Sequence, residues 1–183
     1  MNMLSPSSDF VTERRPVMQG EARVSGDPRI EMTTVLGSCI ASCLFDPIAQ
    51  VGGMNHFLLS EPRFARSDQG VDEHYGVYLM EILINDMLRR GAIKSRLRAH
   101  LYGGANLHRG MSDIGAANAA FARRFLSAEG IALVREDVGG TQARRVDFRP
   151  AHGQARCRFV EAVAPPAPAP TRPARSLGDV ELF

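Results

Sequence analysis

The chain has 183 residues, with 22 Lys and Arg against 20 Asp and Glu and a net charge of +2. This length fits one domain with tails, and so balanced a charge argues against nucleic acid or an anionic membrane as the partner. No apolar run approaches the roughly 18 residues of a membrane span. The polar start of the chain, 1–15, also lacks the apolar core of a signal peptide. We therefore expect a cytoplasmic protein without membrane insertion.

The two ends of the chain have the composition of tails. Residues 1–19 mix Ser, Pro, Arg and Glu without periodicity, which predicts a flexible N-terminal arm. Residues 162–183 open with a Pro/Ala tract that cannot pack a core. Their acidic and apolar tip is either a solvated end or a peptide that docks elsewhere through Val180, Leu182 and Phe183. The folded domain is expected to span 20–161.

The first half of the domain predicts a strand, a hairpin and a helix. The β-branched segment 29–37 predicts a strand, and 39–59 predicts a β-hairpin whose turn contains an Asp-Pro pair. After a polar loop at 61–74, apolar residues recur at helical spacing until Gly91, where a C-terminal glycine would end the helix. The expected apolar face of that helix consists of Tyr75, Leu79, Ile82, Leu83 and Met87.

The second half predicts a strand, a second helix and three more strands. Alternating residues at 96–102 predict a strand with only one buried face. A Gly-rich loop leads to Asp113, an expected helix cap, and Gly130 closes that helix. Three strands follow, at 131–137, 144–150 and 154–162. The order of elements indicates an α/β (α+β) sandwich with mixed sheets and two main helices.

The three cysteines are Cys39, Cys43 and Cys157. An odd number without a secretion signal favours free thiols in a reducing compartment. On a strand, Cys39 and Cys43 would lie about 13 Å apart at roughly 3.3 Å per residue, which excludes a disulfide or a shared metal ion. We expect neither a metal nor a cofactor.

The predicted hairpin brings Cys39 and His56 together. A four-residue loop, or a bulge at Gly52-Gly53, would place the two directly opposite each other on one face. An imidazolium beside a thiol stabilises the thiolate and can then protonate an amine leaving group. The turn through Gly37 and Ser38 would supply backbone N–H groups for an oxyanion. The residues alone leave the alternative open that Cys39 and His56 are both ordinary core residues.

Four segments carry a family resemblance. They are TTVLGSCIASCLFDPIAQVGGMNHFLLS, HLYGGANL, DIGAANAAF and REDVGGTQARRVDF. In their order and spacing these segments resemble the CheD family of chemoreceptor glutamine deamidases, over roughly Gly20 to Val160. The resemblance implies a fold similar to the catalytic domain of the cytotoxic necrotizing factor toxins.

The resemblance also implies a site and a reaction. Its active-site residues fall on Cys39, His56 and Thr33, where the family spacing selects Thr33 over its neighbour Thr34. Cys39 would attack receptor glutamines, His56 would protonate the departing ammonia, and Thr33 would orient the imidazole. The expected substrates are methyl-accepting chemotaxis receptors, with methylesterase activity on receptor glutamyl esters as a side reaction.

Other functions stay open at this point. The family resemblance implies a second class of function, an adaptor that binds and stimulates a CheC-type phosphatase. A cysteine peptidase is a third possibility. The glycine pairs Gly103-Gly104 and Gly139-Gly140 are interpreted as tight turns beside the sheet, with walls of a substrate groove as the alternative.

Overall fold

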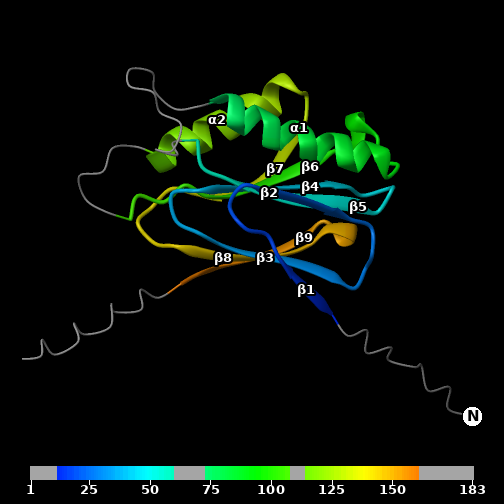
Figure 1. Cartoon of the computed structure of the whole chain (residues 1–183), viewed down its shortest axis with the longest axis horizontal. Helices are drawn as coiled ribbons and strands as arrows, with labels where there is room; N and C mark the ends of the chain where they lie inside the picture. Colours follow the sequence, from blue (N-terminus) through cyan, green and yellow to red (C-terminus); the bar gives the residue numbers. More distant parts are fainter. Residues whose placement is uncertain (1–11, 60–72, 108–113, 161–183) are drawn as a thin grey trace, which may run out of the picture.

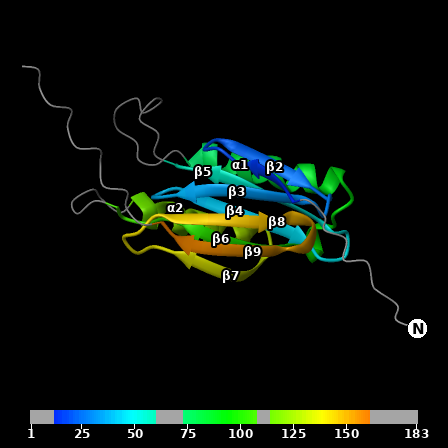
Figure 2. The same ribbon diagram turned by 90° about the horizontal axis from the view of Figure 1, so that it is seen from below.

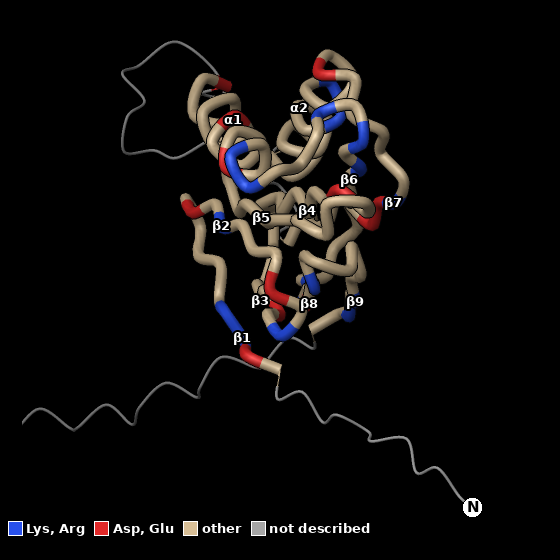
Figure 3. The backbone as a smooth tube through the Cα atoms, turned by 90° about the vertical axis from the view of Figure 1, so that its right-hand side faces the viewer, with Lys and Arg blue, Asp and Glu red and all other residues tan. Residues whose placement is uncertain are grey.

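The structure is a computed structural model that describes residues 12–59, 73–107 and 114–160. Two helices, a five-stranded sheet and a four-stranded sheet lie one above the other (Figures 1 and 3). The expected sandwich of mixed sheets with two main helices is confirmed. Neither helix of this described part is long and apolar enough to cross a membrane. The expected tail at 162–183, with its Val180, Leu182 and Phe183 tip, lies outside the described residues, as do the loop at 61–72 and the Asp113 cap.

The five-stranded sheet carries the predicted hairpin at its centre. Its order is β2-β5-β4-β6-β7. The strands are β2 (Glu21–Ser25), β4 (Ile40–Asp46), β5 (Val51–Phe57), β6 (Arg98–Gly103) and β7 (Ala132–Val138). β7 runs parallel to β6, whereas the other neighbours are antiparallel. The helices α1 (Glu73–Arg89) and α2 (Ile114–Ala128) cover one face.

The four-stranded sheet covers the other face (Figure 2). Its order is β1-β3-β8-β9, from β1 (Glu13–Pro16), β3 (Ile30–Leu36), β8 (Arg144–Arg149) and β9 (Gln154–Phe159). Short 3-10 turns at Lys94–Arg96 and Pro150–His152 complete the fold. β1 is parallel to β3, and the remaining pairs are antiparallel.

Two apolar cores follow from this layering. One lies between the helices and the five-stranded sheet, where Leu83, Met87 and Phe121 pack on Leu44 and Phe57. The other lies between the two sheets and contains Met32, Leu36, Cys43, Met54 and Phe148. β4 and β5 are buried on both faces because they contribute alternate residues to the two cores.

Three features of the fold differ from the sequence-based expectations. The N-terminal arm is shorter than predicted, since Glu13–Pro16 forms β1 and pairs with β3. All four residues of β1 are exposed, so hydrophobic alternation gives no signal there. β2 was not predicted, because half-buried residues with charges between them also lack that pattern.

The third difference concerns β6, which is buried on both faces and not on one. Tyr102 is fully buried and His100 nearly so, and the His100 ring packs edge-on against Phe45 at 5.2 Å. These side chains face the four-stranded sheet. The polar residues Arg98 and His100, which alternate with apolar ones, had suggested that this face of β6 would be exposed to solvent. The first helix, its end at Gly91, and the strands β7 to β9 agree with the predictions.

Asp46 fastens the hairpin turn to the connection between α1 and β6. Its side chain is fully buried and forms an ion pair of 2.8 Å with Arg96. One carboxylate oxygen accepts the N–H groups of Ile48 and Ala49, and the other accepts that of Ile93. Burial would raise the pKa of this carboxyl, but these N–H groups and Arg96 outweigh it and lower the pKa to about 2.

We expect Asp46→Asn to lower the free energy of unfolding at neutral pH by about 1–3 kcal/mol, because the amide leaves Arg96 without its anion. The stabilisation by Asp46 is complete above its ordinary pKa of 3.8 and is lost as the pH falls towards 2. Chemical denaturation of both forms between pH 7 and pH 2 measures this, and the difference should shrink across that acidic range. Asp27→Asn, which breaks an exposed pair with Arg29, is the control and should change stability little.

Candidate active site

Cys39 lies at the end of the turn that joins β3 to β4, half-buried on the side that faces the other sheet. Hydrogen bonds from elsewhere hold all three carbonyl groups of this turn. Ala105 N–H donates to the Gly37 oxygen and Gly104 N–H to the Cys39 oxygen, each at 2.8 Å. The Asn118 amide donates to the Ser38 oxygen, also at 2.8 Å. The backbone beside the thiol is therefore fixed by the end of β6 and by α2.

Asn118 is a buried residue of α2 that no motif or periodicity had singled out. Its side chain spans two segments, because its oxygen accepts the N–H of Leu59 at 3.0 Å while its NH₂ group holds the Ser38 carbonyl. Beside it, Gly103 has a φ of +108°, and an added Cβ would lie 2.1 Å from the Cys39 carbonyl oxygen. The glycine at 103 thus permits the close approach of β6 to the cysteine turn.

The hairpin register places His56 opposite Ala41, not opposite Cys39 as expected. The turn at 47–50 has the four residues that were expected, but with Asp46 paired to Val51 this register places Cys39 level with position 58, so the expectation that such a loop brings it opposite His56 was wrong. The ladder has no bulge at Gly52-Gly53. Cys39 and His56 are therefore diagonal neighbours, a relation in which residues lie about 7–8 Å apart and long side chains still meet. Cys39 and Ala41 alternate with Ile40, so the thiol and the imidazole share the face between the sheets.

Thr34 determines which nitrogen of His56 carries the proton. Thr34 Oγ1 donates to the carbonyl of Val17 at 2.9 Å and lies 2.9 Å from His56 Nδ1. A hydroxyl has one proton, so the Thr34 oxygen must accept from an Nδ1–H group. Nε2 is then the unprotonated nitrogen. It is buried, and within the described residues it has no hydrogen-bond partner.

Thr33 does not have the position that was expected for it. Its hydroxyl donates to Asp147 Oδ1 at 2.9 Å, on the opposite face of β3 from Thr34. Spacing from Cys39 identifies the strand but cannot distinguish two adjacent threonines whose side chains alternate. In this structure Thr34, and not Thr33, contacts the imidazole.

The environment of His56 favours a neutral ring. Burial lowers the pKa of its imidazole below the ordinary 6.5, and the Val17 carbonyl, 3.4 Å from Nδ1, offsets only part of this effect. At neutral pH the side chain is thus an uncharged base with its lone pair on Nε2. The ring can therefore accept a proton, and it does not supply a preformed imidazolium beside the thiol.

The other two cysteines are poor nucleophiles. Cys43 is completely buried, which raises the pKa of its thiol strongly. Burial and the neighbouring Asp137 raise the pKa of Cys157 to about 11. Since the thiolate is the reactive form, both thiols stay protonated and unreactive at neutral pH. Cys39 is the candidate that remains.

A short N-terminal segment, Val17–Glu21, crosses the site, and we call it the strap. Val17 N–H donates to the Thr33 carbonyl at 2.9 Å and Gly20 N–H to the His56 carbonyl at 2.7 Å, so the strap bonds to both sheets. Between these anchors, the Gln19 carboxamide oxygen accepts a hydrogen bond from Cys39 Sγ at 3.3 Å. The first three residues of the strap, Val17 to Gln19, fall in the region predicted as a flexible arm.

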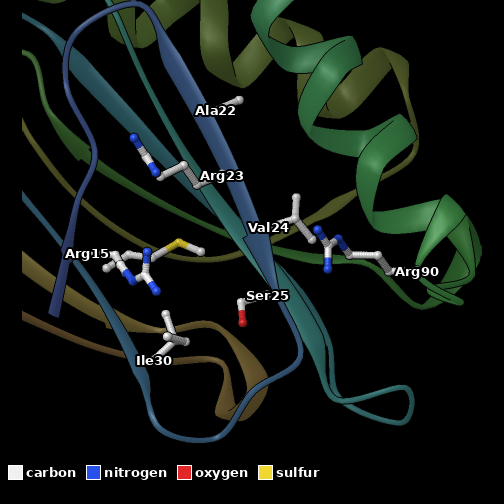
Figure 4. Close-up of a pocket in the computed structure, with 8 residues that line it drawn as sticks. Arg15, Ala22, Arg23, Val24, Ser25, Ile30 and Arg90 are labelled. Carbon is white, nitrogen blue, oxygen red and sulfur yellow. The ribbon is translucent and has the colours of Figure 1, made fainter. Parts of the chain in front are cut away.

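A separate cavity of about 360 Å³ lies beside β2 (Figure 4). Its lining includes Arg15 from β1, Arg23 from β2 and Arg90, which follows α1. It extends along 22–25 and the first half of β3, whereas Cys39 follows the end of β3. Neither Cys39 nor His56 lines this cavity.

Comparison with known proteins assigns the chain to a family. Residues 58–159 match the family model described as CheD chemotactic sensory transduction. The chain belongs to the CheD family. It is 56% identical to the "Probable chemoreceptor glutamine deamidase CheD" of Zymomonas mobilis over 171 residues, 93% of each chain. The protein with the same printed name from Caulobacter vibrioides is 54% identical over 173 residues, 91% of each chain.

A likeness to solved structures is much weaker. The hypothetical protein YfiH of Bacillus licheniformis is 13% identical, with a TM-score of 0.45 over 66% of this chain and 51% of that one. Nothing about function follows from it. The matched segment of the CheD family model begins after Cys39 and His56, so the choice of site residues depends on the geometry above.

We expect Thr34→Val to change the tautomer of His56, because Nδ1–H then keeps only the more distant Val17 carbonyl as an acceptor. Nitrogen-15 NMR of labelled histidine should show Nδ1 protonated in the wild type and a larger Nε2-protonated fraction in the variant. The matched control is Thr33→Val, which should leave the His56 signals in place. A shift with Thr33→Val and none with Thr34→Val would contradict the assignment.

Proposed function

We propose that this CheD-family chain is a protein-glutamine deamidase that converts glutamines of chemotaxis receptors to glutamate. Cys39 is the nucleophile and His56 the general base, and Thr34 positions the imidazole. The observation that carries the proposal is the fixed tautomer, which leaves the Nε2 lone pair of His56 on the face that it shares with Cys39. The printed names of relatives at 54–56% identity support this choice of substrate.

The first half of the reaction forms a thioester. His56 Nε2 accepts the thiol proton as Sγ of Cys39 attacks the amide carbon of the substrate glutamine. The amide oxygen becomes an oxyanion, which backbone N–H groups of the Gly37–Cys39 turn would stabilise. His56 then returns the proton to the amide nitrogen, the C–N bond breaks, and ammonia departs.

The second half uses water. His56 takes a proton from a water molecule whose oxygen attacks the thioester carbon. The C–S bond breaks, the proton goes back to the sulfur, and the product is a glutamate side chain. A glutamyl methyl ester would pass through the same thioester and release methanol, so methylesterase activity is an expected side reaction of this site.

The resemblance to the CheD family also implies a second candidate role, as a partner of a CheC-type phosphatase in a cytoplasmic chemotaxis system. Binding of that kind needs a surface of the protein but not the Cys39 thiol. The adaptor and enzyme functions are therefore separable by a substitution at Cys39 alone.

We expect Cys39→Ala to abolish deamidation, because no other described thiol is placed to form the thioester. Purified protein is incubated with receptor cytoplasmic fragments, and mass spectrometry detects the change from an amino group to a hydroxyl. Cys157→Ala is the control and should retain activity. Equal deamidation by wild type and Cys39→Ala would refute the proposal, and cleaved fragments would indicate a peptidase.

Thr34→Val should reduce kcat for deamidation by about tenfold or more, since a wrongly protonated Nε2 cannot accept the thiol proton. Thr33→Val should have a smaller effect, because its hydroxyl bonds Asp147 and not the imidazole. Steady-state kinetics of the two variants on one receptor fragment provides the comparison. Loss of activity on Thr33→Val alone would exclude Thr34 as the positioning residue.

A further inference from the structure

A side chain that contacts the Cys39 thiol, that of Gln19, carries the same functional group as the proposed substrate. Gln19 presents a primary carboxamide, and its oxygen lies 3.3 Å from Sγ. Sulfur and oxygen at this separation form a hydrogen bond in which the thiol donates. The site therefore already holds a glutamine side chain, supplied by the same chain.

The backbone of the strap keeps Gln19 at this place. Hydrogen bonds anchor the strap on both sides of Gln19, and a Glu21 N–H to Met18 carbonyl bond of 3.0 Å closes the turn around it. Gly20 has a φ of +85°, and a Cβ there would lie 2.7 Å from Tyr75 Oη, so the backbone passes close to α1. Gln19 is thus directed at the thiol by a held turn.

The Gln19 side chain lies at the surface of the protein. Gln19 is exposed, and it has three rotatable bonds through which the carboxamide can turn towards solvent. An incoming glutamine can therefore take its place without unfolding the strap.

The orientation of the carboxamide is wrong for reaction. Attack requires Sγ to approach the amide carbon while the oxygen points to N–H donors. Here the oxygen itself faces the sulfur and accepts a hydrogen bond from the thiol, which is not the arrangement that attack requires.

We infer that Gln19 occupies the amide-binding subsite at Cys39 as an unreactive internal analogue of the substrate, which receptor glutamine must displace. The inference rests on the proposed function, since it assumes that Cys39 is the nucleophile. It assigns to this subsite a primary carboxamide as its ligand, and to Gln19 the role of an internal competitor.

The reactivity of the thiol tests the inference without any receptor. We expect Gln19→Ala to raise the rate of Cys39 alkylation by iodoacetamide about two- to tenfold, the value for losing one hydrogen bond. Peptide mass spectrometry measures the alkylated fraction of Cys39 over time, and the Cys157 peptide, which should stay unmodified, checks that the reagent is selective. Gln154→Ala, which removes an exposed glutamine of β9, is the matched control and should leave the rate unchanged.

A second variant separates the carboxamide from mere steric cover. Gln19→Met keeps the length of the side chain but removes the amide, so it should react as fast as Gln19→Ala. A Gln19→Met rate equal to wild type would overturn the inference, as would an unchanged rate in Gln19→Ala. Thermal unfolding of each variant confirms that the fold is intact.

Kinetics on receptor fragments gives the third readout. Loss of an internal competitor lowers KM with little change in kcat, so Gln19→Ala should lower KM about two- to tenfold. A fall in kcat would instead show that Gln19 assists catalysis, and would overturn the inference. Conversion of Gln19 to glutamate in the wild type but not in Cys39→Ala would also overturn the inference, because Gln19 would then be a substrate. Persistent deamidation by Cys39→Ala would refute the proposed function itself. The alkylation rates test only the contact between Gln19 and the thiol, so the two failures can be distinguished.

Discussion

The hydroxyl group of Thr34 connects the two sheets at the site. Thr34 belongs to β3 of the four-stranded sheet, whereas His56 belongs to β5 of the five-stranded sheet. Since Thr34 gives its proton to Val17, its oxygen must accept from His56, and the ring has its basic nitrogen on the other side. The catalytic state of the imidazole is thus determined by how the sheets pack, together with one carbonyl of the strap.

The thiol is held by different means. Its turn is attached through carbonyl groups to β6 and to the Asn118 side chain of α2, and Gly103 removes the side chain that would push β6 away. Imidazole and thiol are therefore positioned by separate sets of contacts, which join only across the hairpin. A site built on strands and a held turn needs little rearrangement before it reacts, which lowers the cost of aligning the reacting groups.

The sequence predicted the hairpin, both helices and three of the later strands, because each has a periodic apolar face or a clear turn signal. It did not reveal β1 and β2, whose residues are exposed or half-buried, nor the second buried face of β6. These features arise from contacts with strands that are distant in the sequence, and a local hydrophobic pattern does not indicate such contacts.

The candidate site was predictable in part. Cys39 and His56 emerged from the hairpin and from the family resemblance, although the register differs from that expected, since His56 pairs with Ala41. The choice between Thr33 and Thr34, the role of Asn118 and the contact of Gln19 depend on which way side chains point after folding. Sequence spacing alone cannot supply that information.

The strap also bears on where the functional unit of this protein begins. A shortened chain that started at Gly20 would retain Cys39, His56 and nearly every buried apolar residue, and it would still contain all four segments that resemble the family. It would nevertheless lack the Val17 carbonyl that takes the Thr34 proton. In such a truncated protein the threonine could turn its hydroxyl towards the ring, and the histidine would lose the constraint that makes it a base.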